Sequence, residues 1–182
     1  MKTRTTQINR LILQDKWAQA EQLIKRHLRR EPDSHWLLTR LSLTYYERRQ
    51  YKKALSLSQQ ALSLSPKCPL VLWDYAGCLD MLGKELSAIS VWKSLIRRGV
   101  VNIAGGKCGE GISWARMLVN DCRYRIGKTF HQIRNSHAAA PYIRQYLRYR
   151  KVGVGSIYST KDAKLLLTAI NASSPGAKRD PE

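Results

Sequence analysis

The chain has 182 residues, of which 43% are apolar and 25% charged, a composition that excludes a wholly disordered, collagen-like or low-complexity chain. At about 150 residues per domain, this length predicts a single domain. The 32 lysines and arginines outnumber the 13 aspartates and glutamates, and the formal net charge of +19 favours acidic or polyanionic partners.

The first residues do not resemble a targeting segment. The apolar stretch 11–13, which follows Lys2 and Arg4, is too short for a secretory signal, whose apolar core has about 7–15 residues. Mitochondrial presequences are poor in acidic residues, whereas this segment contains Asp15 and Glu21. No apolar run approaches the ~20 residues of a membrane-spanning helix. We therefore expect a cytoplasmic protein that keeps its N-terminus and has no membrane partner.

An internal repeat is marked by three alanines spaced 34 residues apart, Ala20, Ala54 and Ala88, and by two prolines at the same interval, Pro32 and Pro66. Apolar residues around them recur at helical spacing, which predicts two short antiparallel helices in each unit. The predicted helix pairs are 7–14 with 17–30, 36–48 with 52–64, and 70–82 with 86–98.

This pattern resembles the tetratricopeptide repeat, a 34-residue helix-turn-helix with large, small and proline residues at fixed positions. In the unit 35–68 the matching residues are Leu38, Leu41, Ser42, Tyr45, Ala54, Ala61 and Pro66, and Ser58 replaces the usual aromatic. In the unit 69–102 they are Leu72, Tyr75, Ala76, Leu79, Gly83, Ala88 and Trp92. The unit 1–34 is degenerate in its first helix but keeps Leu11, Ala20, Ile24 and Pro32.

The register breaks at residues 99–111, an insertion that we interpret as a loop because five glycines are too many for a packed helix interior. A fourth, atypical repeat is predicted at about 120–153, with its first helix extended back to about Ile112. A helix at about 160–172, with Ser159 or Thr160 as its N-cap, would cap the final repeat. Residues 173–182 are expected to form a disordered tail.

The resemblance therefore implies an all-α, right-handed superhelix of about four helix hairpins with a C-terminal capping helix, as one domain over residues 1–172.

Motifs that carry chemistry are missing from the sequence. It contains no G-x-S-x-G, no H-E-x-x-H and no Walker-type loop, so we predict a non-enzymatic protein without catalytic residues, cofactor or small-molecule substrate. Cysteines 68, 78, 108 and 122 show neither a pairing rhythm nor the C-x2-C spacing of a zinc site, and we interpret them as reduced thiols with no metal. Lys107 and Cys108 could form an anion cradle or a reactive thiol, but no nucleotide fingerprint completes that pattern.

Aromatic residues divide between two sides of the predicted helices. Tyr45, Tyr75 and Trp92 occupy packing positions of the repeat and are predicted to be core. In this family the other side of each first helix lines a concave groove that binds peptides. The resemblance thus implies a partner-binding groove at Trp36, Leu43, Tyr46, Trp73 and Tyr124, while packing between neighbouring repeats is the alternative role for these side chains.

Many cochaperones of this family clamp the C-terminal carboxylate of a chaperone with basic and amide side chains. Here only Asn9 and Arg40 fit that pattern, and Asp74 would repel a carboxylate. We therefore do not transfer the clamp's function to this chain.

The segment 123–151 contains eight basic residues and no acidic one. It is predicted to carry a basic patch made of Arg123, Arg125, Lys128, Arg144 and Arg148. The leading prediction is an adaptor or scaffold that binds another, acidic protein in the groove. The alternative is a nucleic-acid-binding repeat protein, because basic side chains neutralise phosphates and the interleaved tyrosines can stack on bases. Part of the charge has a structural interpretation, since cations near helix C-termini complement the helix dipole.

Overall fold

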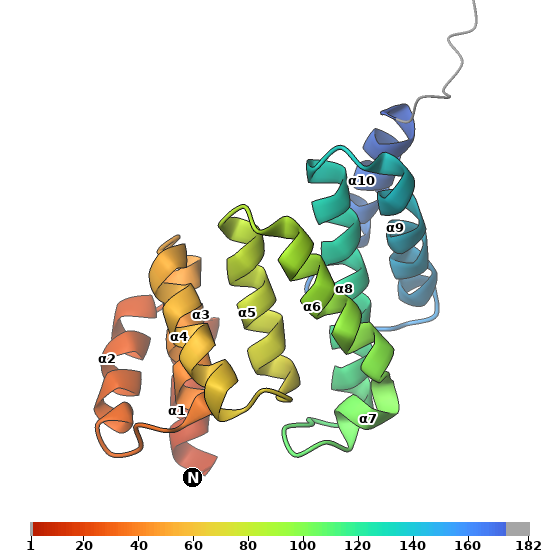
Figure 1. The fold of residues 1–182 in the computed structure, drawn as a ribbon. Coiled ribbons are helices and arrows are strands. Elements are labelled where there is room, and N and C mark those ends of the chain that lie inside the picture. Colours follow the sequence, from red (N-terminus) through yellow and green to blue (C-terminus); the bar gives the residue numbers. More distant parts are fainter. Residues whose placement is uncertain (1, 174–182) are drawn as a thin grey trace, which may run out of the picture. The chain divides into compact units, whose positions relative to one another are not determined.

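The structure is a computed structural model that describes residues 2–173, with side chains from Thr5 onward. The described residues form ten α-helices and no strand, arranged as tetratricopeptide-like helix pairs, so the all-α prediction is confirmed (Figure 1). The chain divides into two compact units, an N-terminal unit over residues 1–84 and a C-terminal unit over residues 85–182. The single-domain assignment of 1–172 stays a prediction.

The N-terminal unit consists of α1 (Lys2–Leu13), α2 (Trp17–Leu28), α3 (His35–Glu47), α4 (Tyr51–Leu64) and α5 (Pro69–Met81). Each helix packs against the next, and α3 also packs against α5. Ser34 caps α3 by accepting a hydrogen bond from the Leu37 amide, and Pro69 occupies the first turn of α5, where its missing N–H costs nothing. The fully buried Ala20 and Ala54 lie in α2 and α4, where small residues let neighbouring helices approach closely.

The core of this unit contains a pair of serines, one of which stands where the repeat pattern has a large aromatic side chain. Ser42 and Ser58 are both buried, and their hydroxyl oxygens lie 2.7 Å apart. Both hydroxyl oxygens also lie within hydrogen-bond distance of the Ala54 carbonyl, at 2.8 and 3.0 Å, so one hydroxyl can donate to that carbonyl and the other to its fellow serine. These bonds satisfy two polar groups at the site where the repeat consensus has an aromatic.

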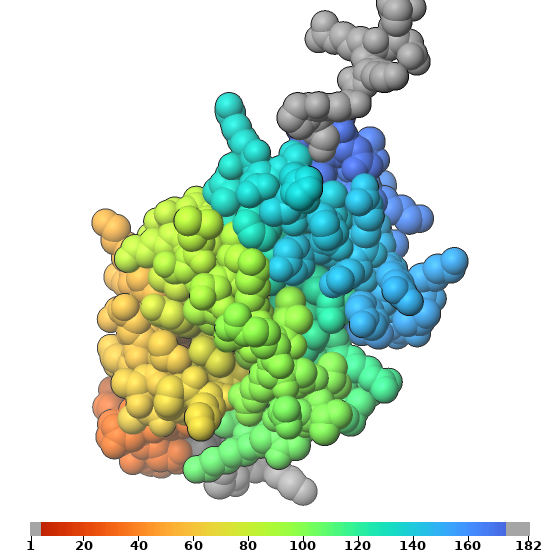
Figure 2. Space-filling view, turned by 45° about the vertical axis from the view of Figure 1, so that its right-hand side comes forward, coloured from red at the N-terminus to blue at the C-terminus, as the bar shows by residue number. Residues whose placement is uncertain are grey.

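The C-terminal unit consists of α6 (Glu85–Arg98), α7 (Val100–Ala104), α8 (Ile112–Gln132), α9 (Ser136–Lys151) and α10 (Thr160–Ala172). Helix α8 packs against α6, α7 and α9, and α10 packs against α9. In Figure 2, α8 and α9 (cyan to light blue) lie closely side by side. Gly127 permits this approach, because a Cβ at that position would lie 2.6 Å from Cδ1 of the buried Ile143.

Most predicted helices agree with the structure to within two residues. The exception is α1, which begins at Lys2 rather than at residue 7, because a helix propagates through residues that lack an apolar pattern. Helix α8 begins at Ile112 as predicted, and α10 spans 160–172 with Ser159, not Thr160, as its N-cap. The predicted tail lies outside the described residues except for Ser173.

The prediction of a loop throughout 99–111 was wrong, since this segment contains the five-residue helix α7. Its glycines lie at position 99 and from 105 onward, so the stretch between them is free to be helical. Gly99 precedes the helix with φ of 77°, a left-handed conformation that suits glycine.

None of the helices in the described part of the chain combines the length and the apolar character needed to cross a bilayer. None of the four cysteines takes part in a disulfide, and Cys78 and Cys122 are buried as expected for small core residues.

Candidate functional site

Helices α3 and α5 pack against each other. We call the surface formed by one side of α3 and the neighbouring part of α5 the α3–α5 face. Its residues on α3 are Trp36, Arg40, Leu43 and Glu47, whose spacing of three or four places them on one side of the helix. The guanidinium carbon of Arg40 lies 5.8 Å from the centre of the Trp36 ring. The charges of Arg40 and Glu47 both act on the carboxyl group of Asp74 on α5, and we therefore assign Asp74 to this face.

The two charged groups at the centre of the α3–α5 face have unused hydrogen-bonding atoms. Nε of Arg40 and Oδ2 of Asp74 are buried, and neither has a hydrogen-bond partner among the described residues. Burial raises the pKa of Asp74 to about 7, although the nearby Arg40 favours its ionised form, and Glu47 raises it further. A buried polar group without a partner costs about 1–3 kcal/mol, so a ligand that supplies one donor and one acceptor would recover that cost.

The other predicted groove residues of the N-terminal unit are also half-buried. Tyr46, near the end of α3, meets Tyr51 of α4 edge to face with ring centres 5.4 Å apart. Trp73 lies beside Asp74 in sequence on α5 and is likewise half-buried. Aromatic side chains with part of their surface exposed can add apolar contact area to the α3–α5 face.

Tyr124, predicted as a groove residue, is an internal packing residue of the C-terminal unit. It is only 7% exposed. Its ring stacks on that of Tyr158 at 4.2 Å between centres and lies 5.2 Å from that of Tyr146. The side chain is therefore covered by the segment that joins α9 to α10, and we leave it out of the proposed binding surface.

A buried carboxylate holds that covering segment in place, a role that the sequence reasoning missed. Asp121 accepts hydrogen bonds from the Ser156 hydroxyl and from the Ile157 amide, the latter at 3.3 Å. The Tyr146 hydroxyl donates to the Tyr158 carbonyl at 2.7 Å. Burial raises the pKa of Asp121 to about 6, and the bond from Ser156 opposes that rise. In the sequence, the one indication of this role is an acidic residue, between Asn120 and Cys122, at a position where helical spacing predicts a buried side chain.

The side chains of the predicted basic patch contact different neighbouring residues. Arg123 lies over Tyr149 with its guanidinium carbon 4.5 Å from the ring centre, and its Nε donates to Gln145 at 3.3 Å. Burial lowers the pKa of Arg123. Arg125 instead lies over Trp92 of α6, at 4.9 Å. These two side chains are thus half-buried cations that pack on separate aromatic rings.

The other three basic residues are exposed. Arg144 and Arg148 share one face of α9, and Arg144 makes a 3.4 Å hydrogen bond to the side-chain oxygen of Asn171 on α10. Lys128 is exposed on α8. These residues, rather than Arg125, are available to an anionic partner.

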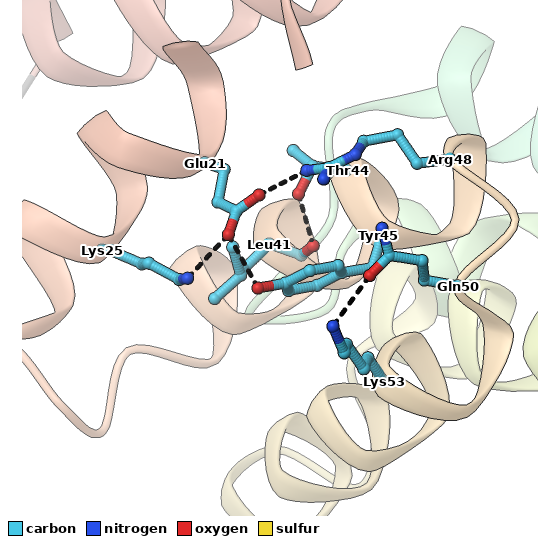
Figure 3. Close-up of polar contacts among 8 residues, drawn as sticks. All are labelled: Glu21, Lys25, Leu41, Thr44, Tyr45, Arg48, Gln50 and Lys53. Carbon is cyan, nitrogen blue, oxygen red and sulfur yellow. Dashed lines mark hydrogen bonds and ion pairs between the residues drawn. The ribbon is translucent and has the colours of Figure 1, made fainter. Parts of the chain in front are cut away.

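Figure 3 shows a charged cluster in the N-terminal unit that has a structural role. Glu21 on α2 accepts hydrogen bonds from Lys25 at 2.6 Å, from Tyr45 of α3 at 2.8 Å, and from Arg48. Partial burial favours a higher pKa for Glu21, but the three hydrogen bonds outweigh it and lower the pKa to about 2. The cluster connects α2 to α3, with the Tyr45 hydroxyl at its edge. Of the three aromatic residues predicted as core, Trp92 is fully buried, whereas Tyr45 and Tyr75 are half-buried.

Comparison with known proteins identifies the fold. No protein-family model matches the chain, and no curated protein sequence matches it. The crystal structure of MamA superposes with a TM-score of 0.66 and 13% identity, over 95% of this chain and 84% of that one. A MamA RS-1 ArsTM double mutant gives 0.60 and 12%, over 94% and 93%. A kinesin-light-chain-like protein of Podospora anserina with nearly identical TPR-like repeats gives 0.63 and 10%, over 98% and 97%. The structural neighbours are tetratricopeptide-repeat proteins, and this chain has their fold.

Proposed function

We propose that this protein is a non-enzymatic scaffold that binds a segment of another protein on the α3–α5 face. Tetratricopeptide-repeat folds typically serve protein–protein interaction and are usually non-catalytic. Trp36, Leu43, Tyr46 and Trp73 would supply apolar contacts, and Arg40 with Asp74 would supply polar ones.

The observation that carries this proposal is the pair of buried polar atoms without partners, Nε of Arg40 and Oδ2 of Asp74. A peptide backbone offers both a carbonyl acceptor for Arg40 and an N–H donor for Asp74. The Trp36 ring beside Arg40 can help to exclude water from those bonds and so strengthen them. A peptide in an extended conformation, whose backbone groups are not hydrogen-bonded internally, therefore fits the chemistry of the face better than a purely apolar or purely anionic ligand.

Site-specific photocrosslinking tests this proposal. A benzoylphenylalanine at Leu43 would lie on the α3–α5 face, and one at Gln59, an exposed residue of α4, serves as the matched control. Irradiation in native lysate should give protein adducts from position 43 that survive nuclease and are missing from position 59. A Trp36→Ala change in the position-43 protein should reduce the adducts at least five-fold while helicity measured by circular dichroism is unchanged. Equal adducts from both positions would contradict the proposal.

A nucleic-acid-binding function is the second candidate, supported by the exposed Lys128, Arg144 and Arg148 in a segment without acidic residues. Such binding would weaken steeply with salt because phosphate neutralisation releases counterions. Nucleic acid that copurifies, raises the ratio of absorbance at 260 to 280 nm and is removed by salt or nuclease would favour this function.

A further inference from the structure

A concave pocket of about 290 Å³ lies in the C-terminal unit. Its apolar lining is Val100 of α7, Val119 of α8, and Val152 and Val154 of the segment after α9. Two arginines of α8, Arg116 and Arg123, complete its wall together with Tyr149.

The pocket exists because α8 is longer than a repeat helix. Helix α8 has 21 residues, whereas α3 and α5 have 13 each. The extra turns of α8, from Ile112 to Val119, precede the predicted repeat 120–153. They place Arg116 beyond the part of the helix that matches the repeat pattern. The pocket is therefore an addition to the repeat architecture and involves none of the residues of the α3–α5 face.

Charge at the pocket is positive. Arg116 is exposed, and among the described residues no carboxylate forms an ion pair with it or with Arg123. Arg123 is fixed in place, because its Nη1 donates to the Val119 carbonyl at 3.2 Å and its guanidinium lies over Tyr149. Asp121 on the same helix accepts hydrogen bonds from Ser156 and Ile157 and is not ion-paired with either arginine.

Apolar side chains at the pocket rim are open to solvent. Val152 is 72% exposed and Tyr149 is 40% exposed, and both line the pocket. Exposed apolar groups gathered around a concavity and bordered by charge are typical of a protein-interaction site.

We propose that this pocket binds one apolar side chain of a partner peptide whose neighbouring residues are aspartate or glutamate. The four valines would cover a side chain of about the size of leucine, and removing that side chain from water would favour binding. The flanking carboxylates would pair with Arg116 and Arg123, where planar guanidinium groups can bind them through two parallel hydrogen bonds. The volume lies just below the range of small-ligand sites, about 300–1,000 Å³, and leaves room for one apolar side chain with part of its backbone.

The test uses two synthetic peptides, acetyl-Glu-Glu-Leu-Glu-Glu-amide and its serine analogue with Ser in place of Leu, titrated into the ¹⁵N-labelled full chain. The leucine peptide should shift the amide resonances of Val119, Val152 and Val154, and the serine peptide should bind at least five-fold more weakly. Arg116→Ala and Val152→Ser, both changes of exposed residues, should each raise the dissociation constant at least five-fold. Arg148→Ala, an exposed arginine outside the pocket, should change it less than two-fold.

Three results would overturn the proposal. One is the lack of pocket shifts with the leucine peptide. Another is equal affinity for the leucine and serine peptides. A third is that a ten-nucleotide oligothymidylate shifts the pocket amides while the acidic peptide does not, which would assign the surface to nucleic acid. Because the photocrosslinking experiment probes the N-terminal unit and these titrations probe the C-terminal unit, the two proposals can fail separately.

Discussion

Glu21 is the residue on which the N-terminal unit's polar contacts converge. Its two carboxylate oxygens are shared by Lys25, Tyr45 and Arg48. Cations also approach the ring of Tyr45, with Lys53 at 5.5 Å and Arg48 at 5.8 Å from its centre. In a chain with so large an excess of basic residues, one carboxylate thus pairs with two of them, Lys25 and Arg48.

We predict that Glu21→Gln destabilises the protein by about 1–2 kcal/mol at pH 7, since charge-assisted bonds to two cations are weakened. The folded-state pKa of Glu21 is about 2, below its ordinary value of 4.5. The contribution of the Glu21 carboxylate to the free energy of unfolding is therefore complete above pH 4.5 and is lost as the pH falls from 4.5 towards 2. Urea unfolding of both proteins at several pH values checks this prediction.

The matched control is Asp33→Asn, which removes an exposed carboxylate from the same unit. It should leave the free energy of unfolding within about 0.5 kcal/mol of the unchanged protein at each pH. If Glu21→Gln behaves like this control, the cluster is a surface contact without a stabilising role.

At the scale of the elements, the turns between paired helices share a backbone conformation. Residues 15, 49 and 83 are spaced 34 apart, and each has a positive φ, of 54°, 58° and 73°. Arg134 has a φ of 60° at the corresponding turn between α8 and α9. Only Gly83 is a glycine, so the other three turns hold side chains in the left-handed region, which disfavours them. This shared turn supports the repeat register at 120–153.

We predict that Arg134→Gly stabilises the protein by about 0.5–1 kcal/mol, because relief of the left-handed strain exceeds the entropy that glycine gains in the unfolded chain. The converse change, Gly83→Ala, should destabilise it by about 1 kcal/mol. Chemical unfolding monitored by circular dichroism measures both effects. A loss of stability in Arg134→Gly would show that the exposed arginine side chain contributes more than its backbone costs.

The sequence predicted those elements that depend on local periodicity. The 34-residue spacing was enough for α2 to α6, and the atypical repeat predicted at about 120–153 contains the α8–α9 pair. Helix α7 was missed because five residues between glycines are too few to show a period. The attachment of 154–158 to Asp121 was missed because it joins positions about 35 residues apart through an aperiodic segment.

Candidate-site residues were harder to predict than helices, for a similar reason. Tyr124 has the spacing of a groove residue, but a tyrosine from a distant segment covers it. The pocket beside Arg116 is formed jointly by α7, the extra turns of α8 and the end of α9. No local sequence pattern predicts that these three segments meet.

At the scale of the whole molecule, the formal charge of +19 implies self-repulsion that salt should screen. We predict that raising NaCl from 50 to 500 mM increases the melting temperature by a few degrees, as measured by differential scanning fluorimetry. The double variant Arg144→Glu/Arg148→Glu should be as stable as the unchanged protein or slightly more so, and its salt response should be smaller. Its one structural cost is the long bond from Arg144 to Asn171.

A fall in melting temperature with added salt would show that attractive pairs such as those of Glu21 dominate over repulsion. A strongly destabilised double variant would show that these two arginines are structural rather than free for a partner.

The placement of the five tryptophans gives each unit its own optical reporter. Trp17, Trp36 and Trp73 belong to the N-terminal unit, and Trp92 and Trp114 to the C-terminal unit. Trp92 is fully buried with the Arg125 guanidinium over its ring, so its fluorescence should be blue-shifted in the folded state and move to longer wavelength when the C-terminal unit opens. Half-buried Trp36 lies on the proposed binding face, so its emission responds to an occupant there. Variants that keep only Trp92 or only Trp36 would thus carry separate signals for the unfolding of one unit and the occupancy of the other.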